Sequence, residues 1–327
     1  MAAKWKMNTE SFQRLMAELE GLTDVQRQCV AERVKTLSER ADSARLIAER
    51  LGTPTSCAHC GDSAVVRFGY SAGHQRYLCK ACGRTFQALT GTPVLRLGDR
   101  EKWLAHAECM RQGMTIRSTA QAVGLTVDRA FRWRHRFLGF LSEQRPAGLT
   151  GVVEADETVF RRSFKGQRKG LPRPAKKRGG PAPEGQEGER VNVLVAMQRG
   201  TRLATDHVLR DVSAATMTAA LRPEVAADAV LSTHGNPSYR VVAASLGIEA
   251  GLFVASYDGP GGDGVWHVQN VNAYDSRLKG WMGRFHGVAT KYLGNYLGWR
   301  RLLDRFQDSV TAQQFLFHAL QPGYVNI

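Results

Sequence analysis

The chain has 327 residues, of which 43% are hydrophobic, so it is long enough for two or three domains with ordinary cores. It contains no run of 18 apolar residues, which excludes a membrane span of the usual kind. The net charge is +15, and this excess favours nucleic acid as the partner over an acidic membrane surface, because no basic amphipathic helix or lipidation signal accompanies it.

Residues 1–52 are predicted to be helical. Apolar side chains recur there at helical spacing in two series: Phe12, Leu15, Met16 and Leu19, then Cys29, Val30, Val34 and Leu37. Between the series, Thr23 and Gln26 have the spacing of a capping box. We interpret this segment as a surface for packing or subunit contact, and Cys29 and the other isolated cysteine, Cys109, as packing residues.

Residues 53–96 contain two Cys-x-x-Cys pairs: Cys57 with Cys60, and Cys79 with Cys82. Each pair can present two thiolates to one metal, and the 18 residues between the pairs suffice for a short hairpin, so the spacing predicts a zinc ribbon with structural Zn²⁺. The alternative is two unrelated pairs of free thiols. A disulfide framework is disfavoured, because few cysteines and no apolar leader indicate a cytoplasmic protein.

Residues 97–145 are predicted to form three helices, with Asp99 capping the first and Thr115 the second. A turn at 124–126 precedes the third, which begins near Val127, as in a helix-turn-helix DNA-binding region. The third helix would then present three arginines to DNA: Arg129, Arg132 and Arg136. A plain three-helix scaffold with a solvated basic face is the alternative.

Residues 150–320 are predicted to form an α/β domain that opens with a strand at 151–156. A basic insertion, 161–190, interrupts it, with nine Lys or Arg and no acid between 161 and 178. We expect the insertion to be flexible without DNA and to contact DNA through Arg162, Lys165, Arg168, Lys169 and Lys177. A solubilising loop is the alternative. Later segments predict a strand hairpin over 191–209, then alternating helices and strands, which together indicate a mixed sheet flanked by helices.

Three segments of this domain carry residues suited to chemistry. Asp156 stands at the end of the first predicted strand, and His234 follows a later strand. A third segment runs from His267 into a helix, where Asn272 and Lys279 are seven residues apart and can face one phosphate. Further on, cations alternate with rings that either stack on bases or belong to the core: Arg284, Lys291, Tyr292, Tyr296, Trp299, Arg300 and Arg301. We predict that these arginines and Lys291 contact phosphate.

The order of these blocks resembles the ISXO-like insertion-sequence transposases. The likeness is carried by the cysteine ribbon, by the blocks at 86–93, 153–158 and 267–279, and by the block at 285–299. It implies a DDE-type enzyme with an N-terminal zinc ribbon and a ribonuclease-H-like catalytic domain. Such an enzyme binds terminal inverted-repeat DNA and target DNA, as a homodimer or larger assembly on the bacterial nucleoid, and cuts and joins strands with Mg²⁺ or Mn²⁺.

Matched position by position, the resemblance assigns the first catalytic carboxylate to Asp156, the third position to Asn272 and the trailing lysine to Lys279. The second Asp is expected where this chain has His234, which leaves one carboxylate to hold a hard cation. Three explanations stay open. The chain is an inactive copy that still binds DNA, or a nearby carboxylate compensates (Glu154, Asp263 or Asp275), or His234 itself ligates a softer ion such as Mn²⁺.

Overall fold

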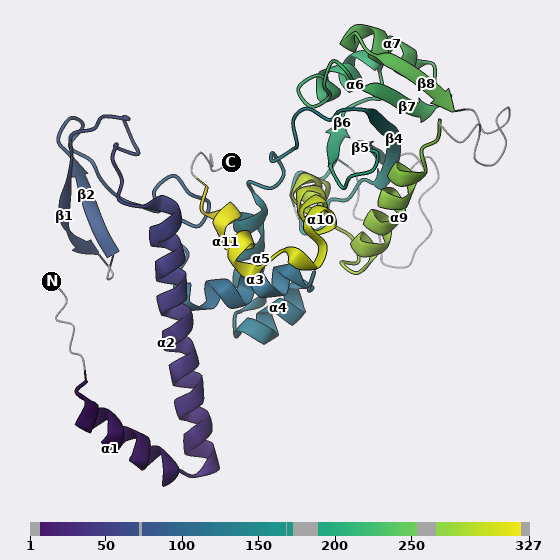
Figure 1. Cartoon of the computed structure of the whole chain (residues 1–327). Coiled ribbons are helices and arrows are strands. Elements are labelled where there is room, and N and C mark those ends of the chain that lie inside the picture. Colours follow the sequence, from purple (N-terminus) through teal and green to yellow (C-terminus); the bar gives the residue numbers. More distant parts are fainter. Residues whose placement is uncertain (1–6, 72–73, 168, 173–188, 254–265, 322–327) are drawn as a thin grey trace.

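The computed structural model describes residues 7–71, 74–167, 169–172, 189–253 and 266–321. Two N-terminal helices, α1 (Thr9–Glu20) and α2 (Asp24–Leu51), extend away from the rest of the molecule (Figure 1). The capping box is confirmed, because Thr23 and Gln26 each accept the other's backbone N–H. No residue of α1 is buried. None of the described helices has the length and apolar content needed to cross a bilayer.

The two isolated cysteines differ from each other. Cys109 is buried, as expected of a packing residue, whereas Cys29 lies exposed on α2, so its assignment to a core was wrong. After α2 the chain forms a three-stranded antiparallel sheet of β1 (Val65–Ser71), β2 (His74–Cys79) and β3 (Thr85–Gln87).

The next region consists of a 3₁₀ turn, η1 (Arg100–Lys102), and three helices, α3 (Trp103–Arg111), α4 (Ile116–Val123) and α5 (Val127–Leu138). Thr115 caps α4 as predicted. Asp99 caps nothing, because it adopts a left-handed conformation before η1 and accepts no capping hydrogen bond. Thr126, not foreseen as a cap, accepts the Arg129 N–H at the start of α5.

The C-terminal half contains a five-stranded mixed sheet with the order β6-β5-β4-β7-β8. Its strands are β4 (Val152–Arg161), β5 (Arg190–Gln198), β6 (Ala204–Leu209), β7 (Val230–His234) and β8 (Glu249–Phe253). The first three are antiparallel, while β7 runs parallel to both β4 and β8. The mixed sheet was predicted, but β8 was not. Because β4 continues to Arg161, Asp156 lies in the middle of a strand and not at its end as predicted.

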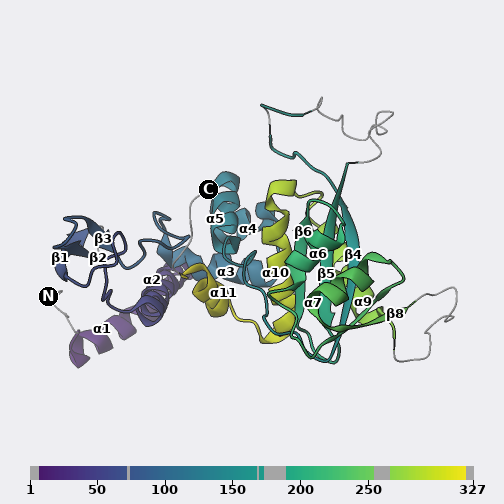
Figure 2. The ribbon, with the colours of Figure 1, turned by 90° about the horizontal axis from the view of Figure 1, so that it is seen from above.

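Helices cover both faces of this sheet (Figures 1 and 2). On one face, α6 (Ala214–Leu221) and α7 (Ser238–Leu246) pack on alternate residues of β4 that include Val153 and Ala155. On the other face lie α9 (Gln269–Gly283) and the start of α10 (Leu293–Phe306). Strand alternation therefore directs Glu154 and Asp156 toward α9.

The chain ends with η2 (Thr290–Tyr292) before α10, and with η3 (Gln307–Ser309) and α11 (Ala312–Ala319) after it. Helices α10 and α11 return to α3 and α5, where Trp299 and Phe315 pack with Trp103, Phe137 and Leu141 in one apolar cluster. The helical region before residue 145 and the end of the chain therefore share a core.

Gly298 allows this close approach. A Cβ at Gly298 would overlap the backbone of Leu141 at the contact between α10 and the segment after α5. We expect Gly298→Ala to destabilise the protein by about 2 kcal/mol, because backbone cannot move aside as a flexible side chain can. Gly280→Ala is the matched control: this helical glycine has open space around its Cβ position, so alanine should stabilise α9 slightly. Urea unfolding of both variants tests the contrast, and equal stabilities would contradict it.

Candidate active site and metal centre

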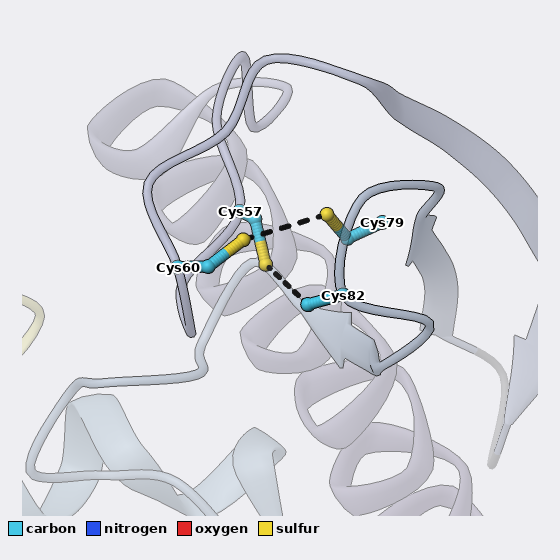
Figure 3. Close-up of side chains that lie close together, drawn as sticks. All are labelled: Cys57, Cys60, Cys79 and Cys82. Atoms are coloured by element: carbon cyan, nitrogen blue, oxygen red, sulfur yellow. Dashed lines mark hydrogen bonds between the residues drawn. The ribbon is translucent and has the colours of Figure 1, made fainter.

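The four paired cysteines converge at the end of the small sheet (Figure 3). Their sulfur atoms all lie within 4.8 Å of one another, with Cys57 and Cys82 at 3.7 Å and Cys60 and Cys79 at 3.6 Å. Four thiolates bound to one zinc ion at about 2.3 Å place neighbouring sulfurs about 3.8 Å apart. The Sγ of Cys57 also accepts the His59 N–H at 3.3 Å, which favours the thiolate. This geometry fits a metal ion with four sulfur ligands in a tetrahedron. It disfavours the alternative of two unrelated pairs of free thiols, because the two pairs lie together.

A second group of polar residues lies between the mixed sheet and α9. Asp156 is 17% exposed at its side chain and accepts the Glu157 N–H on Oδ1 at 2.8 Å. Its Oδ2 lies 3.3 Å from Nε2 of His234, which ends β7 and is 42% exposed. Parallel pairing of β4 with β7 thus brings these two predicted residues together at a surface that solvent can reach.

Glu154 fixes α9 to β4. Its side chain is fully buried, and its Oε2 accepts the backbone N–H groups of both Asn270, at 2.8 Å, and Val271, at 3.2 Å. The Asn270 side-chain amide and Arg199 Nε also donate to Glu154, at 2.7 and 2.8 Å. A carboxylate at a helix N-terminus satisfies orphan donors and opposes the helix dipole. With its oxygens used in this way, Glu154 is not free to replace a missing metal ligand.

The first turns of α9 carry the remaining predicted residues. Asn272 and Lys279 are both exposed, and neither caps the helix, since Val268 occupies the N-cap position without a side-chain bond. Between them, Asp275 is only 6% exposed. Burial and then the nearby Asp156 raise the pKa of Asp275 to about 7, while Lys279 opposes the rise. Asp275 lies on the helix whose start Glu154 holds against β4, one turn before Lys279.

Two other carboxylates, Asp263 and Glu157, are close in sequence to the candidate site residues. Asp263, a possible substitute ligand, lies outside the described residues. Glu157 points to the opposite face of the sheet, toward Tyr239 of α7, where burial raises its pKa. Among the residues that the structure describes, only the four cysteines form a group of three or more His, Cys, Asp or Glu within 4.8 Å. The site around Asp156 is therefore the looser of the two.

Several cations predicted to contact DNA are used inside the protein. Arg301 is buried, where it pairs with Asp206 at 2.5 Å and donates to the carbonyls of Leu141 and Gln144, so its assignment to phosphate contact was wrong. Arg300 is 17% exposed and pairs with Asp304 at 3.0 Å. The Lys165 ammonium donates to three carbonyls, those of residues 285–287.

Other members of the predicted set are more accessible. On α5, Arg132 is 64% exposed beside Asp128, and Arg129 is 37% exposed beside Asp99. Arg136 and Arg284 donate to backbone carbonyls, Lys291 lies over the Tyr292 ring, and Arg162 and Lys169 are exposed. Arg168 and Lys177, together with most of the basic insertion, lie outside the described residues.

The rings near the C-terminus are core residues. Tyr296 and Trp299 are buried, and Trp299 Nε1 donates to the Met110 carbonyl at 3.1 Å, so stacking on bases is excluded for both. Sequence reasoning also missed Arg134, which lies fully buried with its guanidinium 5.0 Å from the Trp299 ring. Its helical position between Trp133 and Phe137 was the available signal.

Removing one cysteine ligand tests the metal centre. We expect wild-type protein to retain one zinc per chain and Cys79→Ser to lose most of it, because the remaining three sulfurs leave the tetrahedron open. Cys29→Ser is the control, since Cys29 is exposed on α2. Metal analysis after gel filtration gives the result, and full zinc retention by Cys79→Ser would exclude a four-cysteine site.

Asp275 should make stability depend on pH. The pKa of Asp275 in the folded state, about 7, lies above its ordinary value of 3.8. The folded protein therefore holds the Asp275 proton more tightly than the unfolded chain does, and the free energy of unfolding falls as the pH rises from about 4 to about 7. Without added divalent cations, Asp275→Asn should therefore be more stable than wild type at pH 8, by about 2 kcal/mol, and similar to it near pH 4. Urea unfolding across this range measures the difference, and a gap independent of pH would contradict the assignment.

Comparison with known proteins bears on this region directly. Residues 148–300 match the family model of the ISXO2-like transposase domain. A Halobacterium salinarum protein described as an uncharacterized protein in transposable element ISH50 is 28% identical over 275 residues, covering 81% of this chain and 90% of its own.

Two solved structures show weaker likeness. A chain of the simian T-cell lymphotropic virus intasome, in complex with PP2A regulatory subunit B56 gamma, has 11% identity and a TM-score of 0.29 over 59% of this chain and 66% of its own. A chain of a pre-cleavage Mos1 transpososome has 13% identity and a TM-score of 0.24 over 63% and 77%. Superpositions of this quality define no shared fold. The family match and the relative confirm the resemblance to ISXO-like insertion-sequence transposases, and residues 148–300 carry the match to the ISXO2-like transposase domain.

Proposed function

We propose that this protein is a DNA transposase that binds the ends of its insertion sequence and catalyses metal-dependent cleavage and strand transfer. The observation that carries the proposal is that the ISXO2-like domain coincides with the sheet and helix that hold Asp156, Asn272 and Lys279. The strand order, with three antiparallel strands followed by two parallel ones, supports a ribonuclease-H-like fold for this domain.

In the proposed reaction, this chain's residues position a DNA phosphate at the α9 edge of the sheet. A bound Mg²⁺ or Mn²⁺ would supply Lewis-acid activation of water and of the 3′-hydroxyl. Asp156 supplies a hard anionic oxygen, and Asn272 offers an amide oxygen one turn before Asp275. Lys279 adds an exposed positive charge for the phosphate. The bonds from Glu154 to Asn270 and Val271 hold α9 in place while charge develops.

The other regions suit DNA recognition. We propose that the cysteine cluster is a zinc ribbon and that α4 and α5, joined by a three-residue turn, form a helix-turn-helix whose exposed Arg132 faces DNA. Net charge of +15 supports terminal-repeat and target DNA as partners, bound more weakly as salt rises. Joining two ends calls for at least two catalytic domains, so we propose a homodimer or larger assembly on cytoplasmic, nucleoid DNA.

His234 gives the competing proposal its basis. An imidazole replaces the expected second carboxylate, and Glu154 is engaged with α9, so Asp156 and Asp275 are the described carboxylates left between β4 and α9. Should two carboxylates prove too few, the protein would be a catalytically impaired, transposase-derived DNA-binding protein.

A strand-transfer assay with terminal DNA and Mg²⁺ or Mn²⁺ separates the two proposals. We expect wild type to be active and Asp156→Asn to lose cleavage by at least about a hundredfold while binding DNA normally, because Asp156 contributes to chemistry and not to affinity. Activity that appears only in His234→Asp would favour the binding-protein alternative. Cleavage by Asp156→Asn at the wild-type rate would exclude this site altogether.

A further inference from the structure

Asp275 is a buried carboxylate without a hydrogen-bond partner for one oxygen. The residue is 6% exposed, and its Oδ1 accepts no hydrogen bond from any described group. It also forms no ion pair within the described part of the chain, although Lys279 acts on it from one turn away. Burial of a carboxylate costs free energy unless donors or a cation satisfy it. Other buried acids in the same domain have a cation or N–H donors as partners: Glu154 accepts N–H groups, Asp304 pairs with Arg300, and Asp206 pairs with Arg301 through Oδ1, although its Oδ2 accepts no hydrogen bond from a described group.

The surroundings of Asp275 consist of further oxygen atoms. Glu154 holds the start of α9 against one face of β4, Asp156 stands next on that face, and Asp275 is buried on α9, so the packing of α9 on β4 brings both carboxyl groups between the same two elements. Thr158, two residues beyond Asp156 on the same face of β4, is 2% exposed, and its hydroxyl makes no hydrogen bond of normal geometry. Asn272 precedes Asp275 by one helical turn. Adjacent carboxylates with hydroxyl and amide oxygens are the donor set of a hard divalent cation.

His234 is a different kind of neighbour. Its Nε2 lies 3.3 Å from Asp156 Oδ2, within ion-pair distance of the carboxylate. Imidazole is also a poorer ligand than carboxylate for Mg²⁺ and Mn²⁺. The side chain at position 234 therefore fits a role in orienting Asp156.

We propose that Asp275 of α9 supplies the second carboxylate of the catalytic cation site, together with Asp156, and that His234 positions Asp156 without ligating the ion. The inference rests on the proposed function for the identity of the site. It assigns to a helix the ligand that the family pattern places at the end of β7. The site would bind Mg²⁺ or Mn²⁺. The hydrogen bonds that Glu154 accepts from Asn270 and Val271 would set the distance between its two carboxylates.

Binding of Mn²⁺ tests the inference without DNA. Zinc-saturated full-length protein is titrated with Mn²⁺ at pH 8, and loss of the free-ion paramagnetic resonance signal gives the affinity. We expect Asp275→Asn and Asp156→Asn each to weaken binding by about tenfold or more, whereas His234→Ala changes it by less than about threefold. Glu108→Gln is the control, because Glu108 lies on α3, where it pairs with Arg111, and should leave the affinity unchanged.

Stability separates loss of a ligand from misfolding. Asp275→Asn is expected to be at least as stable as wild type at pH 8, so weak Mn²⁺ binding by a stable variant supports the inference. Wild-type affinity in Asp275→Asn, or a loss in His234→Ala as large as in Asp156→Asn, would overturn it. DNA cleavage is measured separately. If the protein binds Mn²⁺ through Asp275 but cuts no DNA, the proposed function is wrong and the proposed cation site is still supported.

Discussion

The placement of the candidate site depends on the hydrogen bonds that Glu154 accepts from the start of α9. A fully buried carboxylate on the central strand receives two backbone N–H groups, a side-chain amide and a guanidinium. These bonds hold the start of α9 against β4, on the face of the strand that also carries Asp156. Removing the acceptor would leave buried donors unsatisfied and the helix free to rotate.

The strong positive charge of the chain is only partly a surface property. Arg301 and Arg134 are buried. The single carboxylate of Asp304 forms ion pairs with three more arginines: Arg277, Arg300 and Arg202. These arginines join α9 and α10 to the edge of the sheet. Exposed cations of the described residues include Arg132 on α5, Lys169 in the basic insertion and Lys279 on α9. Net charge alone therefore does not tell which cations are on the surface and which are paired inside the protein.

Features that depend on local spacing could be predicted from the sequence. The capping box at Thr23, the convergence of Cys57 with Cys82, and the strands around Asp156 and His234 follow from short patterns. Features that depend on long-range packing could not. Whether Arg301 meets solvent or Asp206 is decided by the register of β6 against α10, some 95 residues apart in sequence. The length of β4 beyond Asp156 is likewise set by pairing with β5.

Asp275 shows where a family pattern misleads most. The pattern directs attention to the position that lost its carboxylate, His234, and local reasoning offered three substitutes of equal standing. The fold distinguishes the two that it describes, because the oxygens of Glu154 accept helix and side-chain donors, whereas Asp275 keeps one buried oxygen without a hydrogen-bond partner. A metal ligand lost from the end of β7 can therefore be replaced by one on α9, because hydrogen bonds hold α9 at a fixed position on β4.

The core that joins α10 and α11 to α3 and α5 also limits how such proteins can diversify. Trp299 and Phe315 fill space among Trp103 and Phe137, and the absence of a side chain at Gly298 lets the backbones touch. Recombination near residue 146 would exchange the N-terminal half between relatives. The side chains of α3 and α5 would then come from one protein and those of α10 and α11 from another, so the shared core would pack poorly. Substitutions on exposed faces are therefore tolerated more easily than replacement of the whole N-terminal half.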